Sequence, residues 1–115
     1  MERRRFPRVP SWLSATYARA GAESPQPTVA RNVSGGGCAF FTSSLLPAGT
    51  VLELTLEAEG RRVACTARVM WSGKLLLTRP DEYPWAYEAG VRFLQMAQED
   101  LAFLLRAATS TAPPT

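Results

Sequence analysis

The sequence predicts an all-β domain with one C-terminal helix, arranged as a six-stranded antiparallel β-barrel. Two observations carry this prediction. Short segments alternate apolar and polar residues at close spacing, with turns that contain glycine or proline between them. One segment near the C-terminus then changes to the helical period. At 115 residues the chain is one domain by length, and its helix is expected to cover one opening or one edge of the barrel.

The first half of the chain contains three predicted strands. In the first of them, Leu13 and Tyr17 lie on the same face. In the second, Asn32 and Ser34 lie on the face opposite Val33. The three strands cover residues 11–20, 28–34 and 38–42, with a loop at 21–27 and three glycines at 35–37.

The clearest element is a β-hairpin in the middle of the chain. Residues 51–58 place leucine at alternate positions, so we expect these leucines to face inward. Glu59-Gly60 predicts a tight turn, and residues 61–71 form the return strand. On that strand, every second residue from Val63 to Trp71 is expected to point inward.

A final strand and a helix are predicted near the C-terminus. Glu99 and Asp100 stand in the first turn of the helix and Arg106 in the last, where their charges complement the helix dipole. The apolar stripe of this region consists of Leu94, Ala97, Leu101, Leu104, Leu105 and Ala108. The predicted segments are a turn at 72–73, a short apolar stretch at 74–78, a loop at 79–85, the strand at 87–93, the helix at about 98–108 and a disordered tail at 109–115.

The composition argues against an enzyme and against a metal protein. Histidine is absent, which removes the commonest general base and the commonest metal ligand. Cys38 and Cys65 could pair across strands, but we expect them to be free core thiols. No apolar run approaches the roughly 20 residues of a membrane span, and none follows the basic N-terminus as in a signal peptide. We therefore expect no cofactor and a cytoplasmic location.

The first ten residues carry an excess of positive charge equal to that of the whole chain, which is +3. Prolines exclude a regular helix there, so residues 1–10 are expected to form a flexible arm that attracts anions. Arg4 and Arg8 point to the same side of an extended arm, about 13 Å apart, and could grip one compact anion from both ends. Arg3 and Arg5 add charge. The alternative is a solvated basic segment without a specific ligand, and the preference for arginine could also reflect a GC-rich genome.

The segment Asn32-Val33-Ser34-Gly35-Gly36-Gly37 is the second unusual stretch. Three glycines inside a strand pattern indicate either a tight turn or bulge, or a place where the backbone must approach a ligand closely. Asn32 offers a donor and an acceptor, and Ser34 offers a hydroxyl. These groups can bind the edge of a nucleotide base or a phosphate.

Taken together, Arg4-x-x-x-Arg8 and Asn32-x-Ser34-x-x-Gly37 resemble the two motifs of the PilZ domain family, and Gly90-Val91-Arg92-Phe93 is similar to that family as well. The resemblance implies an arm at 1–10 and a barrel with its helix at 11–108. It also implies that the domain binds cyclic di-GMP. The residues implied to bind it are Arg4, Arg8, Asn32, Ser34 and Gly37, with Arg3, Arg5, Arg31 and Gly36 as accessory residues. Asn32 replaces a frequent aspartate, and the loss of that charge predicts a lower affinity.

The function expected from this resemblance is that of a bacterial second-messenger receptor in motility or exopolysaccharide regulation. Binding would order the arm and change the surface that is offered to a downstream protein partner. The alternative is a protein-interaction module of the same fold that does not depend on nucleotide. A small barrel that binds single-stranded nucleic acid is disfavoured, because the chain beyond Arg8 has no charge excess.

Overall fold

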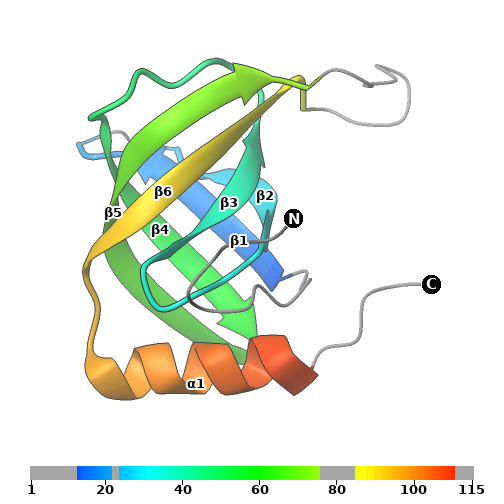
Figure 1. Ribbon diagram of the computed structural model, residues 1–115, viewed down its shortest axis with the longest axis vertical. Coiled ribbons are helices and arrows are strands. Elements are labelled where there is room, and N and C mark those ends of the chain that lie inside the picture. The colour runs from blue at the N-terminus through cyan, green and yellow to red at the C-terminus, as the bar shows by residue number, and fades with distance from the viewer. Residues whose placement is uncertain (1–12, 22–23, 76–84, 111–115) are drawn as a thin grey trace, which may run out of the picture.

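The computed structural model describes residues 13–21, 24–75 and 85–110. Within these ranges the chain forms six strands and one helix (Figure 1). The bounds are β1 Leu13–Arg19, β2 Gln26–Arg31, β3 Gly37–Thr42, β4 Val51–Ala58, β5 Arg61–Lys74, β6 Tyr87–Gln95 and α1 Gln98–Ser110.

The strands close into a barrel in the order β1-β2-β3-β6-β5-β4, and each neighbouring pair is antiparallel. The closing pair is β1 with β4, where Ala15 lies opposite Leu56. Closure removes the open sheet edges that would otherwise expose unpaired backbone groups. The predicted fold class, a six-stranded antiparallel barrel with one C-terminal helix, is therefore confirmed.

The interior of the barrel is filled by the alternate side chains that the pattern predicts. Leu52, Leu54 and Leu56 of β4 are fully buried. Tyr17 and Phe40 meet across the interior with their ring centroids 5.0 Å apart. The turn between β4 and β5 is also as predicted, since both of its residues, Glu59 and Gly60, have a positive φ.

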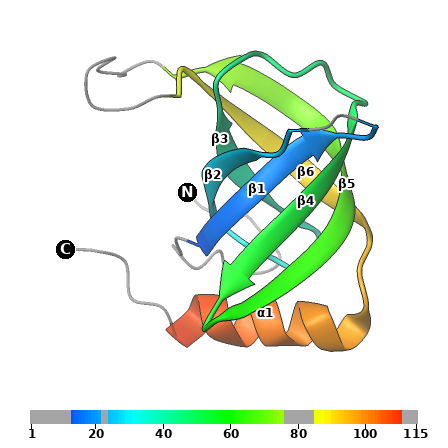
Figure 2. The ribbon, with the colours of Figure 1, turned by 180° about the vertical axis from the view of Figure 1, so that it is seen from behind.

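Helix α1 lies across one opening of the barrel, as both views of the ribbon show (Figures 1 and 2). Leu104, Ala107 and Ala108 of the helix belong to the same buried core as the strands. Arg61, at the start of β5, forms an ion pair with Asp100 and places its guanidinium 4.5 Å from the ring centroid of Phe103. The helix thus closes one end of the barrel through apolar burial and an ion pair at its first turn.

The predicted helix end is two residues short, because α1 continues to Ser110. Arg106 is therefore not in the last turn. Leu94, predicted to lie on the apolar stripe, instead belongs to β6 and is exposed. It stands at an irregularity of the ladder, where Thr66 pairs with Gln95 but Ala67 pairs with Phe93.

The second predicted strand is displaced along the chain. It begins at Gln26 and ends at Arg31, because Asn32 adopts the left-handed conformation with φ 57°. Asparagine tolerates this region better than most residues. The expectation that Asn32 and Ser34 continue the strand alternation is therefore wrong, and the chain instead turns after β2 so that Val33 is buried.

The return strand of the hairpin is longer than predicted and contains a β-bulge. β5 continues to Lys74, so the turn predicted at 72–73 is wrong. Val69 pairs with Val91 and Trp71 with Gly90, which leaves Met70 as the extra residue. The bulge reverses the alternation, and Trp71 lies on the outer face with 48% of its surface exposed rather than in the interior.

The two cysteines are free and buried, as predicted. Burial raises the pKa of the Cys65 thiol to about 11. Burial raises the pKa of Cys38 further, and a charge on Cys65 would add to that effect. Both thiols are therefore protonated, unreactive core groups at neutral pH.

The described part of the chain contains no helix long and apolar enough to cross a membrane. The apolar stretch predicted at 74–78 lies partly in β5, and its residues from 76 onward lie outside the described ranges, as does most of the predicted loop at 79–85.

Replacing Leu104 with alanine tests how strongly the helix is held. The side chain is fully buried, so its loss is expected to lower the free energy of unfolding by about 2–5 kcal/mol in urea denaturation. Leu45→Ala is the matched control, because Leu45 is 54% exposed, and its effect is expected to stay below about 0.5 kcal/mol. Equal effects of the two substitutions would contradict the packing of α1 against the barrel.

Candidate functional site

A surface depression of about 240 Å³ lies on the outer face of the barrel, between β3, β5, β6 and the loop that follows β2. Its floor consists of small residues and backbone from β3 and β6, and one side is formed by large side chains of β5. The residues that line it are Asn32, Ser34, Gly36, Gly37, Cys38, Ala39, Met70, Trp71, Gly90 and Val91.

The loop from Asn32 to Gly37 is held in shape by its own backbone and by one hydroxyl. The Ser34 N–H donates to the Gly37 carbonyl at 2.9 Å. The Ser34 hydroxyl donates to the same carbonyl at 3.3 Å and accepts the Gly36 N–H at 3.4 Å. These bonds close a compact turn and leave the Ser34 oxygen with one unused acceptor lone pair.

The amide of Asn32 makes no hydrogen bond to any part of the chain that the structure describes. The residue is half-buried at the rim of the depression, where an unmatched donor and acceptor carry a desolvation cost. An amide in this position is free to pair with a ligand that offers both a donor and an acceptor, such as the edge of a purine base.

Gly37 and the neighbouring strand approach each other more closely than any side chain would allow. A Cβ atom on Gly37 would stand 1.9 Å from the carbonyl oxygen of Val91. The adjacent Gly36 carbonyl accepts the Phe93 N–H at 2.8 Å. The close approach that the glycines suggested is therefore made to β6, and it joins the loop directly to the barrel wall.

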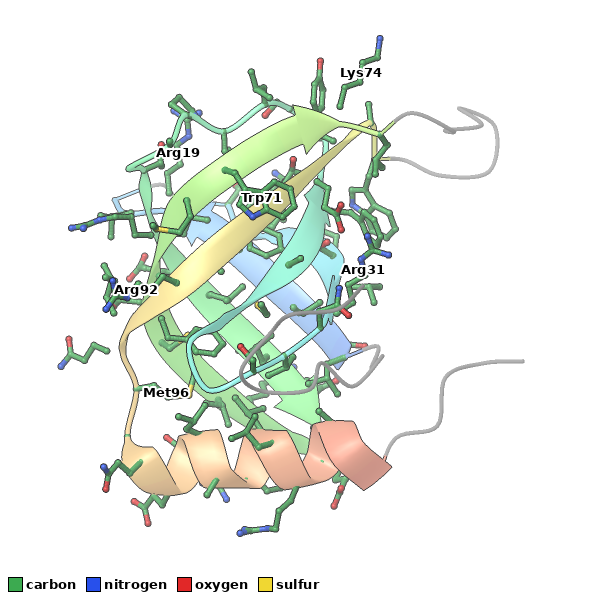
Figure 3. The ribbon with its side chains drawn as sticks, viewed as in Figure 1. Arg19, Arg31, Trp71, Lys74, Arg92 and Met96 are labelled. Carbon is green, nitrogen blue, oxygen red and sulfur yellow. The ribbon has the colours of Figure 1, made fainter. Side chains whose placement is uncertain are left out.

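Trp71 is the residue of the site that reasoning from the sequence missed. Its indole lies across β6 at Gly90, where a Cβ atom would stand 2.2 Å from the indole Nε1 (Figure 3). The sequence pattern of β5 gives no sign of the bulge that turns Trp71 outward. The available signal was Gly90, since a glycine inside a strand often leaves room for a large neighbour.

Arg31, predicted as an accessory cation, is engaged elsewhere. Its guanidinium bonds to the Glu88 carboxylate, at 2.8 Å from Nε and 2.5 Å from a terminal nitrogen. It also lies 5.2 Å from the ring centroid of Phe41, which in turn stacks on Trp85 at 5.5 Å. This cluster supports the strand that leads into Asn32, and Arg31 does not line the depression.

The structure thus brings together four of the predicted site residues around one depression, namely Asn32, Ser34, Gly36 and Gly37. The predicted arm residues Arg3, Arg4, Arg5 and Arg8 lie outside the described residues.

The arrangement of these groups is suited to binding a ligand. The depression offers an amide, a hydroxyl, a floor of small residues and an exposed indole, which together match a planar, polar ligand. Cys38 borders the depression, but its side chain belongs to the buried core, and burial raises the pKa of its thiol so that it stays protonated. Within the described ranges no group of three or more side chains is placed to hold a metal ion.

Comparison with known families shows the family to which the chain belongs. The sequence model of the PilZ domain matches residues 2–109. The chain is a member of the PilZ domain family. The match includes both motifs that suggested the resemblance. No curated protein shows a significant match to the chain.

Two solved structures share the fold of this PilZ domain. The Bacillus subtilis inhibitor of motility, MotI/DgrA, is similar with a TM-score of 0.69 and 20% sequence identity, over 92% of this chain and 49% of that one. The PilZ domain of CeSA, from a cellulose-synthesizing bacterium, is similar with a TM-score of 0.64 and 16% identity, over 90% of this chain and 95% of that one. This chain therefore spans about half the length of MotI/DgrA.

Replacing Gly37 with alanine tests the contact between the loop and β6. The added methyl group would meet the Val91 carbonyl, so we expect a loss of roughly 1–3 kcal/mol in the free energy of unfolding. Gly35→Ala is the matched control, because nothing lies within 4 Å of a Cβ atom at that position. A Gly37→Ala variant as stable as Gly35→Ala would contradict the close approach.

Proposed function

We propose that this PilZ domain binds cyclic di-GMP in the depression formed by β3, β5, β6 and the loop after β2. One observation carries the proposal: the motif residues Asn32, Ser34, Gly36 and Gly37 line a single open depression, with the Asn32 amide unmatched by any described group. The family supports it, because PilZ domains are in general receptors for this nucleotide.

The chemistry of the nucleotide fits the groups that surround the depression. Cyclic di-GMP has two guanine bases, each with a flat face and an edge of donors and acceptors, and two phosphates. Asn32 would pair with a guanine edge. The Ser34 hydroxyl would accept a hydrogen bond from a guanine N–H, or would turn away from the Gly37 carbonyl to donate to a phosphate. Trp71 would stack on a base face, an interaction worth about 1–3 kcal/mol per base.

The depression by itself is smaller than most ligand sites, which measure roughly 300–1,000 Å³. A nucleotide bound there needs a cover. The arginines of the arm, Arg4 and Arg8, are suited to this role, since guanidinium groups bind phosphate and the O6 and N7 atoms of guanine. We propose that they close over the nucleotide and complete the site.

The bound nucleotide and the arm would together cover the exposed Trp71 and Met70 and present a different surface to a protein partner. The names of the two structural neighbours, an inhibitor of motility and a domain of a cellulose-synthesizing bacterium, suggest that motility and exopolysaccharide production are the outputs to examine. Cyclic di-GMP is an intracellular messenger, so we propose that the domain acts in the cytoplasm.

A second function is favoured by one specific feature. Met70, Trp71 and Leu94 are large apolar side chains exposed on the outer face of β5 and β6, which is also what a protein-binding surface requires. A PilZ domain that binds its partner without nucleotide would use the same face. The two functions differ in whether the isolated domain binds cyclic di-GMP.

Calorimetric titration of cyclic di-GMP into the wild-type domain and into Arg4→Ala/Arg8→Ala tests the proposal. We expect binding to the wild type and a loss of about 100-fold or more in the double variant, because each hydrogen bond from a charged group contributes about 1.5–3 kcal/mol. Arg19→Ala/Arg106→Ala removes the same charge at exposed positions away from the depression and is expected to bind normally.

The possible results of this titration test the receptor function and the role of the arm separately. An absence of binding to the wild type would contradict the receptor function and favour the nucleotide-independent module. Wild-type affinity in Arg4→Ala/Arg8→Ala would contradict the role of the arm and leave the receptor function in place.

A further inference from the structure

Arg92 is held beside the loop from Asn32 to Gly37 by the backbone of the residues before and after it. On one side, the carbonyl of Val91 occupies the space that a side chain on Gly37 would need. On the other side, the N–H of Phe93 donates to the carbonyl of Gly36 at 2.8 Å. The Cα atom of Arg92 itself is 3.1 Å from the position of a Cβ atom on Gly37.

The side chain of Arg92 is exposed on the outer face of the barrel, because the neighbouring Val91 is buried in the interior. It extends outward from β6 on the side of β5 (Figure 3). In the ladder between β5 and β6, Arg92 is directly opposite Arg68, which is also exposed. Two like charges directly opposite each other in a sheet destabilise the fold.

No carboxylate of the described chain neutralises this pair. The described ion pairs engage Arg31, Arg61 and Arg62. The nearest acidic position in the ladder is Glu53, which is opposite Thr66 and so diagonal to Arg68, and no ion pair joins them. Two guanidinium groups that no described carboxylate neutralises therefore stand on β5 and β6, the strands that wall the depression, although neither residue lines it. Their repulsion lowers the stability of the barrel.

We propose that Arg92, assisted by Arg68, binds a phosphate of cyclic di-GMP at the Gly37 end of the depression. This inference rests on the proposed function and assigns a phosphate-binding cation to the barrel wall in addition to the arm. Neighbouring strands are only about 4.8 Å apart, so the long side chain of Arg92 can reach the rim of the depression. The bound phosphate would relieve the repulsion between the two arginines, and Arg68 would act chiefly through its charge.

The test compares cyclic di-GMP titrations and thermal unfolding of Arg92→Gln, Arg68→Gln and a control, Arg19→Gln. Arg19 is exposed and carries the same charge, but β1 does not line the depression. We expect Arg92→Gln to bind about tenfold more weakly and Arg68→Gln about threefold more weakly, while Arg19→Gln stays within about twofold of the wild type. Arg92→Lys, which keeps the charge, is expected to bind more tightly than Arg92→Gln.

Thermal unfolding distinguishes a ligand-binding residue from a structural one. Without nucleotide, Arg92→Gln is expected to have a Tm equal to or above that of the wild type, because the like-charge contact is removed. A fall in both Tm and affinity would overturn the inference in favour of a structural role. Wild-type affinity in Arg92→Gln would overturn it while leaving the receptor function intact, whereas an absence of binding to the wild-type domain would overturn the proposed function and this inference with it.

Discussion

The contact between Gly37 of β3 and the backbone of β6 is the constraint on which the rest of the site depends. A side chain at position 37 would occupy the space of the Val91 carbonyl, so only glycine lets β3 enter the barrel at this point. The same approach brings the Gly36 carbonyl to the Phe93 N–H and fixes the loop that carries Asn32 and Ser34. Gly37 thus determines how the loop packs against β6, and this packing positions Asn32 and Ser34 at the depression.

A second glycine, on the neighbouring strand β6, also leaves space for a close contact. Gly90 of β6 has no side chain, and the indole of Trp71 occupies that space from the neighbouring strand. The bulge at Met70 is what turns Trp71 to the outer face. The depression therefore depends on two glycines. The backbone of Val91 occupies the side-chain space of Gly37, and the Trp71 indole occupies that of Gly90.

The fold could be predicted from the sequence because most of its determinants are local. Alternating leucines predicted β4, Glu59-Gly60 predicted the turn, and the change of period predicted α1. The errors have a common origin in backbone conformation and strand register. The pattern of β5 continues without interruption through Trp71, so nothing local indicates the bulge, which depends on pairing with β6. The left-handed conformation of Asn32 and the proximity of Arg92 to Gly37 likewise follow from contacts between distant segments.

The central claim is that cyclic di-GMP occupies the outer face of β3, β5 and β6, and NMR titration of the isotope-labelled domain tests it most directly. Addition of the nucleotide should shift the amide signals of Gly36, Gly37 and Gly90 and the indole N–H signal of Trp71. The amides of β1, on the other side of the barrel, should change little. Shifts centred on β1 and β4, or no shifts at saturating nucleotide, would contradict the account.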